Sequence, residues 1–284
     1  MIYLNAFTFP NEDMEFKFFM DIKRTCYDTY YPFKTLSKHA FDRIDFEPIT
    51  ILYGGNGSGK STALHVIAEK TAIKRDSIYN KSNFYADYVN LCKMQLGTDI
   101  PENSRIITSD DVFDYMLNIR NLNEGIDQKR EKMFEEYLDA KYSDFQMKSI
   151  ADYEQLKKVN STRSKTQSRF VRNKLMDNVR EYSNGESAFT YFTEKIGENG
   201  LYILDEPENS LSPARQMELM KFIEDSARFF GCQFIISTHS PFLLAMSGAK
   251  IYDLDENPVT VKRWTELGNV RTYYEFFKSY EHQF

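Results

Sequence analysis

The sequence lacks the features that mark membrane-spanning, secreted and disulfide-stabilised proteins. No run of about 18 apolar residues occurs, and the start from Met1 to Pro10 has no basic region followed by an apolar stretch. The three cysteines, Cys26, Cys92 and Cys232, are scattered without metal-ligand spacing, which argues against a disulfide framework or a zinc site. We therefore expect a cytoplasmic protein with no membrane partner.

An excess of positive charge is also absent. A net charge of −6 over 284 residues argues against a protein that coats nucleic acid over its whole surface, although it allows a local basic patch. The composition, with 42% hydrophobic and 27% charged residues, is typical of a folded protein and not of a disordered one. The length allows one large domain or two small ones.

A glycine-rich loop is the most specific feature of the sequence. It lies between a β-prone run, Ile49–Tyr53, and a segment of helical apolar spacing, Ser61–Lys70. This context suits the pattern G-x-x-x-x-G-K-[ST], whose backbone N–H groups surround phosphate oxygens at a helix N-terminus. We expect Lys60 to reach the β- and γ-phosphates and the Ser61 hydroxyl to bind Mg²⁺. The predicted ATP-binding residues here are Gly54, Gly55, Asn56, Gly57, Ser58, Gly59, Lys60, Ser61 and Thr62.

Two further apolar runs end in residues that can act on a phosphate group. The run Leu201–Leu204 reads as a strand buried on both faces, and Asp205 and Glu206 follow it. Parallel strands present functional side chains at their carboxyl ends, so we expect Asp205 to hold Mg²⁺ and Glu206 to face the attacking water. The second run, Cys232–Ile236, precedes His239, which would sense the γ-phosphate if both strands flank the glycine loop. Taken singly, a solvated acidic turn and a structural histidine are the alternatives.

In this order along the chain, the three segments resemble the Walker A, Walker B and switch-histidine segments of ABC-type ATPases. The resemblance implies an α/β fold, a P-loop ATPase head with an N-terminal antiparallel β subdomain and an inserted helical lobe. It also implies ATP and Mg²⁺ as cofactors, ATP hydrolysis, and a homodimer or a paired ATPase subunit. The segment Asp205–Pro213 resembles stand-alone AAA-family ATPases, relatives of the overcoming-lysogenisation and RecF-like ATPases, and Glu186 resembles the SMC and DNA-repair branch. In that family Asn209–Ser212 would form the D-loop, which crosses the dimer interface.

The resemblance further implies a signature segment, before Walker B, that contacts the nucleotide of the opposite subunit. Tyr182–Ser187 matches it in part, because Asn184 replaces a glycine and Glu186 replaces a glutamine, and a helix is expected from about Ala188. A plain N-cap box of the form Ser-x-x-Glu is the alternative, and both can hold together. The implied contact residues are Ser183, Asn184, Gly185 and Glu186.

Two other family elements have only approximate counterparts. The segment equivalent to the Q-loop, Arg105–Phe113, contains no glutamine, so Asp110 or Ser109 would replace it as a ligand of Mg²⁺ or water. Gln95 is the alternative if the alignment is shifted. An aromatic residue that stacks on adenine is also implied, and Tyr31 and Phe33 are the candidates, with ordinary core packing as the competing explanation.

The wide spacing of the motifs predicts an inserted helical lobe. Lys60 and Asp205 lie 145 positions apart (205 − 60), and apolar residues between Ile126 and Tyr142 recur at helical spacing. We expect a single ATPase domain over residues 1–284. Its parts would be a β subdomain with Walker A at 1–113, a helical lobe at 114–190, and a Walker B and switch-histidine lobe at 191–284. Elsewhere we expect a strand-like piece at Phe16–Ile22, strands at Ile251–Leu254 and Val259–Trp264, and a helix near Tyr273–Tyr280.

A basic run interrupts this acidic chain. Between Gln155 and Met176 there is no Asp or Glu, and the positive residues are Lys157, Lys158, Arg163, Lys165, Arg169, Arg172 and Lys174. The run is a candidate contact for phosphates of DNA or of a trans-bound nucleotide, and a solvated or protein-binding face is the alternative. The sequence therefore predicts an ATPase that acts on DNA or controls an effector protein such as a nuclease or toxin. The ATPase subunit of a membrane transporter and a nucleotide-dependent scaffold are the rival hypotheses.

Overall fold

The computed structural model describes residues 1–23, 26–142, 153–154, 157, 160, 164, 166–172 and 184–283. Contacts divide the chain into two compact units. We call Met1–Phe113 together with Asn184–Phe284 the core unit, and Asp114–Ser183 the inserted unit. The expected three-part division of the chain stays a prediction.

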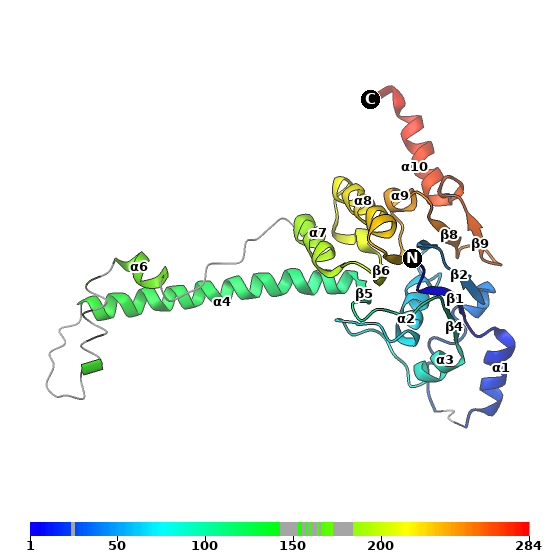
Figure 1. Cartoon of the computed structure of the whole chain (residues 1–284), viewed down its shortest axis with the longest axis horizontal. Helices are drawn as coiled ribbons and strands as arrows, with labels where there is room; N and C mark the ends of the chain where they lie inside the picture. Colours follow the sequence, from blue (N-terminus) through cyan, green and yellow to red (C-terminus); the bar gives the residue numbers. More distant parts are fainter. Residues whose placement is uncertain are drawn as a thin grey trace. The chain divides into compact units, whose positions relative to one another are not determined.

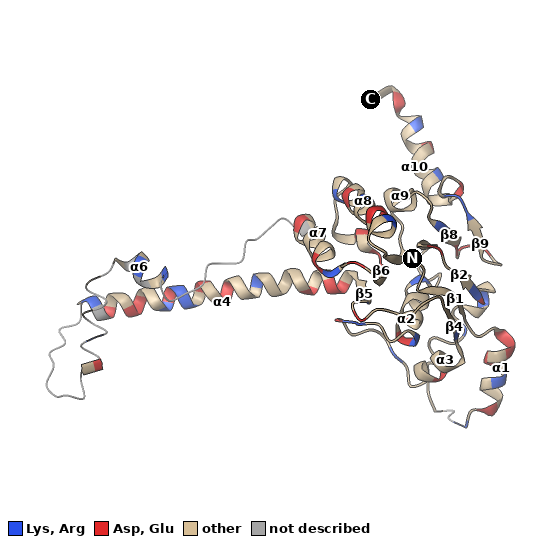
Figure 2. Cartoon of the chain, in the orientation of Figure 1, with Lys and Arg blue, Asp and Glu red and all other residues tan. Residues whose placement is uncertain are grey.

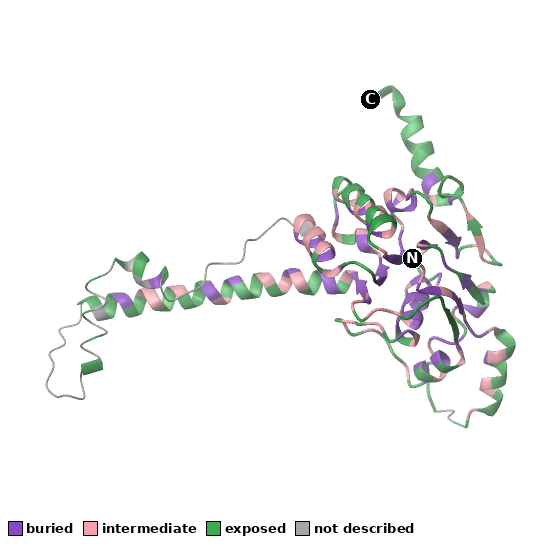
Figure 3. Ribbon diagram, viewed as in Figure 1, coloured by how far each residue is buried: buried purple, intermediate pink, exposed green. Residues whose placement is uncertain are grey.

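A six-stranded sheet forms the centre of the core unit (Figure 1). All of its neighbouring strands pair in parallel except the last pair, which is antiparallel. Three strands are buried along their whole length, which explains their continuous apolar sequences (Figure 3). In spatial order the strands are β5 (Arg105–Thr108), β6 (Leu201–Asp205), β7 (Gln233–Ser237), β3 (Ile49–Tyr53), β8 (Lys250–Asp253) and β9 (Thr260–Lys262).

A three-stranded antiparallel sheet is the second layer of the core unit. It contains β2 (Arg43–Asp45), β1 (Leu4–Thr8) and β4 (Lys93–Leu96), in that order. The fully buried Gln233 of β7 links the two sheets, because its side-chain oxygen accepts from the N–H groups of Tyr3 (2.8 Å) and Leu4 (2.9 Å). The predicted α/β class with an N-terminal antiparallel sheet is confirmed.

The core unit also contains α-helices and short 3-10 helices. The α-helices in this unit are α1 (Glu12–Asp21), α2 (Lys60–Lys70), α3 (Tyr85–Leu91), α7 (Asn184–Lys195), α8 (Pro213–Phe229), α9 (Pro241–Leu244) and α10 (Gly268–Ser279). Short 3-10 helices are η1 (Ser37–His39), η3 (Pro207–Ser210), η4 (Trp264–Glu266) and η5 (Glu281–Gln283). Within the described residues no helix has the length and apolar character needed to span a bilayer.

The described part of the inserted unit is mostly helical, as expected. It contains most of the 34-residue helix α4 (Ser109–Tyr142) together with α6 (Gln167–Arg172). Tyr137 and Val171 are buried against each other, with Met133 and Phe134 packed around them. Acidic and basic residues both occur along α4, as Figure 2 shows.

The structure corrects the prediction for Phe16–Ile22 and contains a strand, β4, that the sequence did not predict. Phe16–Ile22, expected to be strand-like, belongs to α1 and the cap that follows it. The Asn11 side chain accepts from the N–H of Met14 and acidic residues fill the first turn, and these helix-start signals outweigh the β preference of the aromatic residues. The strand β4 was not predicted, because all four of its residues are exposed and give no alternating pattern.

Other helix boundaries differ by a few residues. The helix after the signature segment begins at Asn184 and not near Ala188, so three of the four signature residues lie in its first turn. The last long helix, α10, begins at Gly268, before the predicted Tyr273. The two late strands, β8 and β9, lie close to their expected positions.

Candidate functional site

The glycine loop joins the end of β3 to the start of α2, as predicted. Gly57 (φ 85°) and Gly59 (φ 94°) have left-handed backbone conformations that favour glycine. A Cβ on Gly59 would also lie 2.8 Å from Cδ2 of Leu36. Both glycines are therefore required for the path of a loop whose end is the N-terminus of a helix.

The side chain of Lys60, the first residue of α2, folds back onto this loop. It is buried, and Nζ donates to the carbonyl oxygens of Gly54 (2.7 Å) and Gly55 (3.1 Å). Burial lowers the pKa of Lys60, while the carboxylates of Glu206 and Asp205 act in the opposite direction. An ammonium group has three donors, so one remains for a phosphate oxygen.

Ser61, in the first turn of α2, and Asp205, the last residue of β6, lie close together, as the sequence suggested. The Ser61 hydroxyl donates to Oδ1 of Asp205 at 3.0 Å, and Ser237 of β7 donates to the same oxygen. Burial raises the pKa of Asp205, and both hydroxyl bonds oppose that shift. A hydroxyl and a carboxylate are the oxygen donors that Mg²⁺ takes beside a nucleotide phosphate, so this pair fits the predicted ion.

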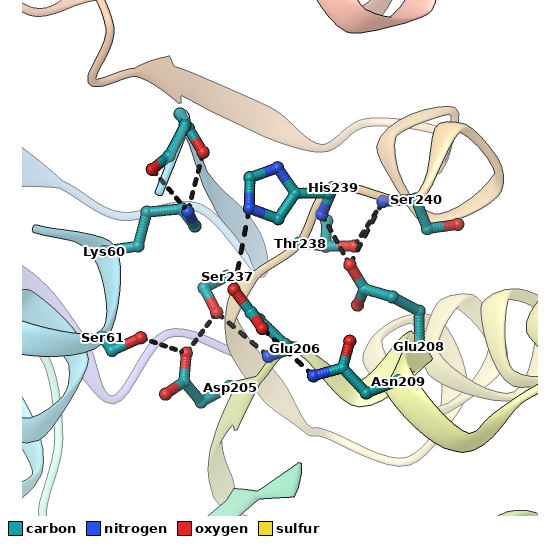
Figure 4. Close-up of polar contacts among 12 residues, drawn as sticks. Lys60, Ser61, Asp205, Glu206, Glu208, Asn209, Ser237, Thr238, His239 and Ser240 are labelled. Atoms are coloured by element: carbon teal, nitrogen blue, oxygen red, sulfur yellow. Dashed lines mark hydrogen bonds and ion pairs between the residues drawn. The ribbon is translucent and has the colours of Figure 1, made fainter. Parts of the chain in front are cut away.

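Glu206 and His239 lie together beside this pair (Figure 4). Oε1 of Glu206 is 3.6 Å from Nε2 of His239, and Oε2 accepts from the side-chain amide of Asn209 at 3.1 Å. Glu206 has a left-handed backbone (φ 48°), held by an N–H bond to the carbonyl of Ser237 at 3.1 Å. Burial lowers the pKa of His239, as does the positive charge of Lys60. The three strand ends thus bring together the carboxylates, lysine and histidine that the sequence singled out.

The signature residues are only partly within the described structure. Ser183 lies outside the described residues, and Asn184 is the first residue of α7. Glu186 pairs with Arg215 of α8 at 3.3 Å. A Cβ on Gly185 would lie 3.6 Å from the carbonyl oxygen of Ser210, at the end of η3. The start of α7 therefore packs on the expected D-loop of the same chain.

The candidate Q-loop residues do not meet the other site residues. Asp110 is exposed in the first turn of α4, and none of its contacts within the described residues reaches Ser61 or Asp205. The neighbouring Asp111 is buried and accepts from the N–H and the hydroxyl of Thr108, so it caps the helix. Gln95 is exposed on β4. A role of Asp110 toward the metal stays a prediction.

The two candidate adenine-stacking residues differ in their surroundings. The Tyr31 hydroxyl donates to Oγ1 of Thr62, next to the glycine loop, at 3.1 Å. Phe33 is buried and stacks on Phe18 with ring centroids 4.5 Å apart. Tyr31 therefore lies beside the candidate site, whereas Phe33 belongs to the core.

Sequence reasoning did not single out several residues that contact the site, among them Asp255, Glu208 and His65. The N–H of Gly55 donates to Oδ1 of Asp255 at 2.6 Å, and the N–H of His239 donates to Oε1 of Glu208 at 2.6 Å. His65 of α2 has Nε2 3.9 Å from Oδ2 of Asp205. Asp255 directly follows the predicted strand Ile251–Leu254, so the strand-end signal that pointed to Asp205 could also have found it, although its partner is 200 positions away. The helical spacing of Ser61 and His65 does place both on one face of α2.

The tautomer of His65 follows from its other neighbour. Nη1 of Arg75 lies 2.7 Å from Nδ1 of His65, and because a guanidinium only donates, Nδ1 must accept. The remaining proton is then on Nε2, which faces Asp205. The ring stacks on Tyr79 with centroids 5.0 Å apart. Burial, and then the charge of Arg75, lower the pKa of His65 to about 4.

Two family models match the sequence. Residues 43–209, more than half of the chain, match the model described as "ABC transporter". Residues 178–245 match the model described as "AAA domain, putative AbiEii toxin, Type IV TA system". The first span contains the glycine loop and the carboxylate pair, and the second contains the carboxylate pair and the histidine.

Solved structures of ATPase cassettes align with most of the chain. A dimeric ATP-binding cassette in a post-hydrolysis state, bound to ADP and Pi, is 13% identical over 78% of this chain and 88% of its own, with a TM-score of 0.37. The Smc head domain from Pyrococcus furiosus, bound to the C-terminal domain of ScpA, is 14% identical over 83% and 95%, with a TM-score of 0.38. Scores this low carry no functional information. No curated protein matched the sequence.

Replacing His65 with Gln should flatten the pH dependence of the free energy of unfolding. The pKa of His65 is about 4 when folded and 6.5 ordinarily, so between these values the unfolded chain takes up a proton that the folded chain does not. Stability from the neutral ring is complete above that range and is lost as the pH falls through it. We expect a loss of about 2 kcal/mol between about pH 7 and pH 5, measured by urea denaturation. The exposed His282→Gln control should keep the wild-type dependence, and an unchanged dependence in His65→Gln would contradict the assignment.

Proposed function

Because this chain belongs to the ABC transporter family of ATPases, we propose that it binds ATP with Mg²⁺ and hydrolyses it to ADP and phosphate. The proposal depends on one observation, the approach of Glu206 to His239 (3.6 Å) beside the bonded pair Ser61 and Asp205. A carboxylate that can accept a proton from water thus lies next to an oxygen pair suited to Mg²⁺.

Each residue of the site has one proposed role. The N–H groups of the glycine loop and the ammonium of Lys60 bind and orient the phosphates. Ser61 and Asp205 would hold Mg²⁺, which when bound supplies positive charge against the charge that develops on the transferred phosphoryl group. Glu206 orients the attacking water and accepts its proton, and His239 hydrogen-bonds the γ-phosphate. The lowered pKa of His239 favours its neutral ring at neutral pH.

We also propose that two copies enclose the nucleotide. Each site would combine Lys60 and Glu206 of one subunit with the signature residues 183–186 of the other. Three described features support this arrangement: Gly185 and Glu186 lie at the N-terminus of α7, α7 packs on the D-loop, and Asn209 of the D-loop donates to Glu206. A helix N-terminus favours the negative charge of a phosphate. A second, non-identical ATPase subunit would supply the same signature residues in place of the identical copy.

The finer function that we propose is control of an effector protein or an action on DNA, in the cytoplasm. The similarity of residues 178–245 to a toxin–antitoxin AAA model supports a nuclease or toxin partner of the kind found in phage-defence modules. The basic run between Lys157 and Lys174 supports contact with phosphates. Of its described members, Lys157, Arg169 and Arg172 are exposed.

The ATPase subunit of a membrane transporter is the second candidate, favoured by the printed description of the larger model match. Against it stand the partial signature segment, the absence of a Q-loop glutamine in Arg105–Phe113, and the Pro-Glu-Asn continuation after Glu206. Co-purification with a membrane permease would decide for the transporter.

Glu206→Gln should lower ATP turnover by about 100-fold or more, because the amide cannot accept the proton of the attacking water. ATP affinity should stay close to that of the wild type. Phosphate release and binding of a fluorescent ATP analogue measure the two quantities separately. The matched control is Glu102→Gln, an exposed carboxylate in a turn, which should keep wild-type turnover. Full activity in Glu206→Gln would remove the assigned role.

The same variant tests the enclosed dimer. With hydrolysis slowed, light scattering should record a doubling of the molecular mass when ATP and Mg²⁺ are added. Adding Lys60→Ala to the variant should abolish the increase, because the phosphates then lose their buried cation. A mass that does not respond to ATP would contradict the shared site.

If the basic run contacts DNA, binding should be salt-sensitive and should weaken when Lys157, Lys158, Arg163 and Lys165 are all changed to Ala. Each lost phosphate contact should reduce the slope of log K against log salt by about 0.9. Fluorescence anisotropy with a labelled duplex measures both effects. The control changes four exposed lysines of the core unit in the same way: Lys17, Lys23, Lys38 and Lys93. Equal losses in the two variants, or none, would refute the basic-run proposal.

A further inference from the structure

The backbone of His239 is held by side chains on both of its polar groups. Its N–H donates to Oε1 of Glu208 at 2.6 Å, and its carbonyl accepts from the side-chain amide of Asn269 at 2.9 Å. The next N–H, of Ser240, donates to the same Glu208 oxygen at 3.2 Å. His239 follows β7 and precedes α9, so regular secondary structure supplies neither of its backbone bonds.

Glu208 reaches this segment from η3, two residues after Glu206. One carboxylate oxygen accepts two adjacent N–H groups, and charge-assisted bonds of this kind are about twice as strong as neutral ones (Figure 4). Burial raises the pKa of Glu208, and the bond from the N–H of His239 is the first of the contacts that oppose this shift. Oε1 of Glu208 therefore bonds the histidine segment, whereas Oε2 is buried and has no hydrogen-bond partner among the described residues.

Asn269 reaches the segment from the other side, in the first turn of α10. Its own N–H donates to the Tyr53 hydroxyl at 3.1 Å, and Tyr53 is the last residue of β3, before the glycine loop. The Tyr53 ring also packs edge-on against the imidazole of His239, with centroids 6.4 Å apart. Asn269 therefore links the backbone of His239 to β3, the strand that leads into the glycine loop.

The ring nitrogen Nε2 of His239, in contrast to the backbone, is available to a ligand. Among the described residues, Nε2 of His239 has no hydrogen-bond partner, although this atom is buried and lies 3.6 Å from Oε1 of Glu206. A buried ring nitrogen without a partner is costly unless a ligand satisfies it. Rigid backbone support fixes where that nitrogen points, and this matters because a catalytic hydrogen bond depends on placement within a fraction of an ångström.

We propose that Glu208 and Asn269 are positioning residues that hold His239 from opposite sides and so fix its ring against Glu206 and the γ-phosphate. This inference deepens the proposed ATPase function and depends on it for its kinetic consequence. Glu208 acts from the loop that carries Glu206, and Asn269 acts from α10. In this proposal the two residues act through the backbone of His239 and not on the nucleotide.

Hydrogen exchange tests the clamp without any need for catalysis. In the nucleotide-free protein, the amide of His239 should exchange on the order of tenfold faster in Glu208→Ala than in the wild type. The amide of Ser240 should change less, because it also donates to Oγ1 of Thr238 at 3.0 Å. Asn269→Ala should also speed the exchange of this segment. Glu208→Gln keeps an oxygen acceptor and should lie between the wild type and Glu208→Ala. The control Glu275→Ala, an exposed carboxylate on α10, should leave exchange unchanged. Wild-type exchange in both alanine variants would overturn the proposal.

Steady-state kinetics then separates positioning from general structural support. Glu208→Ala and Asn269→Ala should each lower kcat by on the order of tenfold with little change in KM for ATP. In a His239→Ala background neither substitution should lower kcat further, because the residue that they position is gone. Equal losses in both backgrounds would overturn the positioning role. If the wild type and Glu206→Gln turned over ATP at the same rate, the proposed function would fail instead, and the exchange result would still decide the clamp.

Discussion

The parallel register of β6, β7 and β3 is the constraint on which the site depends. Ser237, the last residue of β7, pairs with Asp205 on one side and with Leu52 on the other. The carboxyl ends of the three strands therefore align, and residues nearly 150 positions apart meet at one edge of the sheet. Ser237 strengthens the alignment, because its hydroxyl donates to Asp205 and accepts from the N–H of Glu206. A slip of one residue in either pairing would turn these groups to the opposite face.

Burial shifts the pKa values of the groups at these strand ends. It lowers the pKa of Lys60 and of His239 and raises that of Asp205, so every shift has the sign that desolvation produces. Lys60 and the carboxylates offset part of this cost for one another. The glycine loop, the buried cation and the oxygen pair together form a polar site that suits an anion and a divalent cation. Enzymes that transfer phosphoryl groups rely on positioning and charge of this kind.

Sequence alone predicted the elements whose signal is local. The glycines, the two apolar runs and the residues at their ends each follow from neighbouring residues, so their secondary structure and their meeting could be anticipated. Asn269 could not be found this way, because it lies in the first turn of α10 and does not follow an apolar run. Asp255 does follow one, Ile251–Leu254, and the same reasoning could have included it. The helix α1 was mistaken for a strand because its aromatic residues signal β structure, whereas its cap and acidic first turn decide the outcome.

The ends of β3, β6 and β7 are proposed to form a site for ATP and Mg²⁺. Isothermal titration calorimetry of the full chain with ATP, with and without Mg²⁺, tests it most directly, using Lys60→Ala beside Lys70→Ala, a lysine at the far end of α2. We predict Mg²⁺-dependent binding to the wild type and to Lys70→Ala, and affinity at least about tenfold weaker for Lys60→Ala, which lacks the charge-assisted bonds to phosphate. Equal affinity in Lys60→Ala, or no binding by the wild type, would contradict the account.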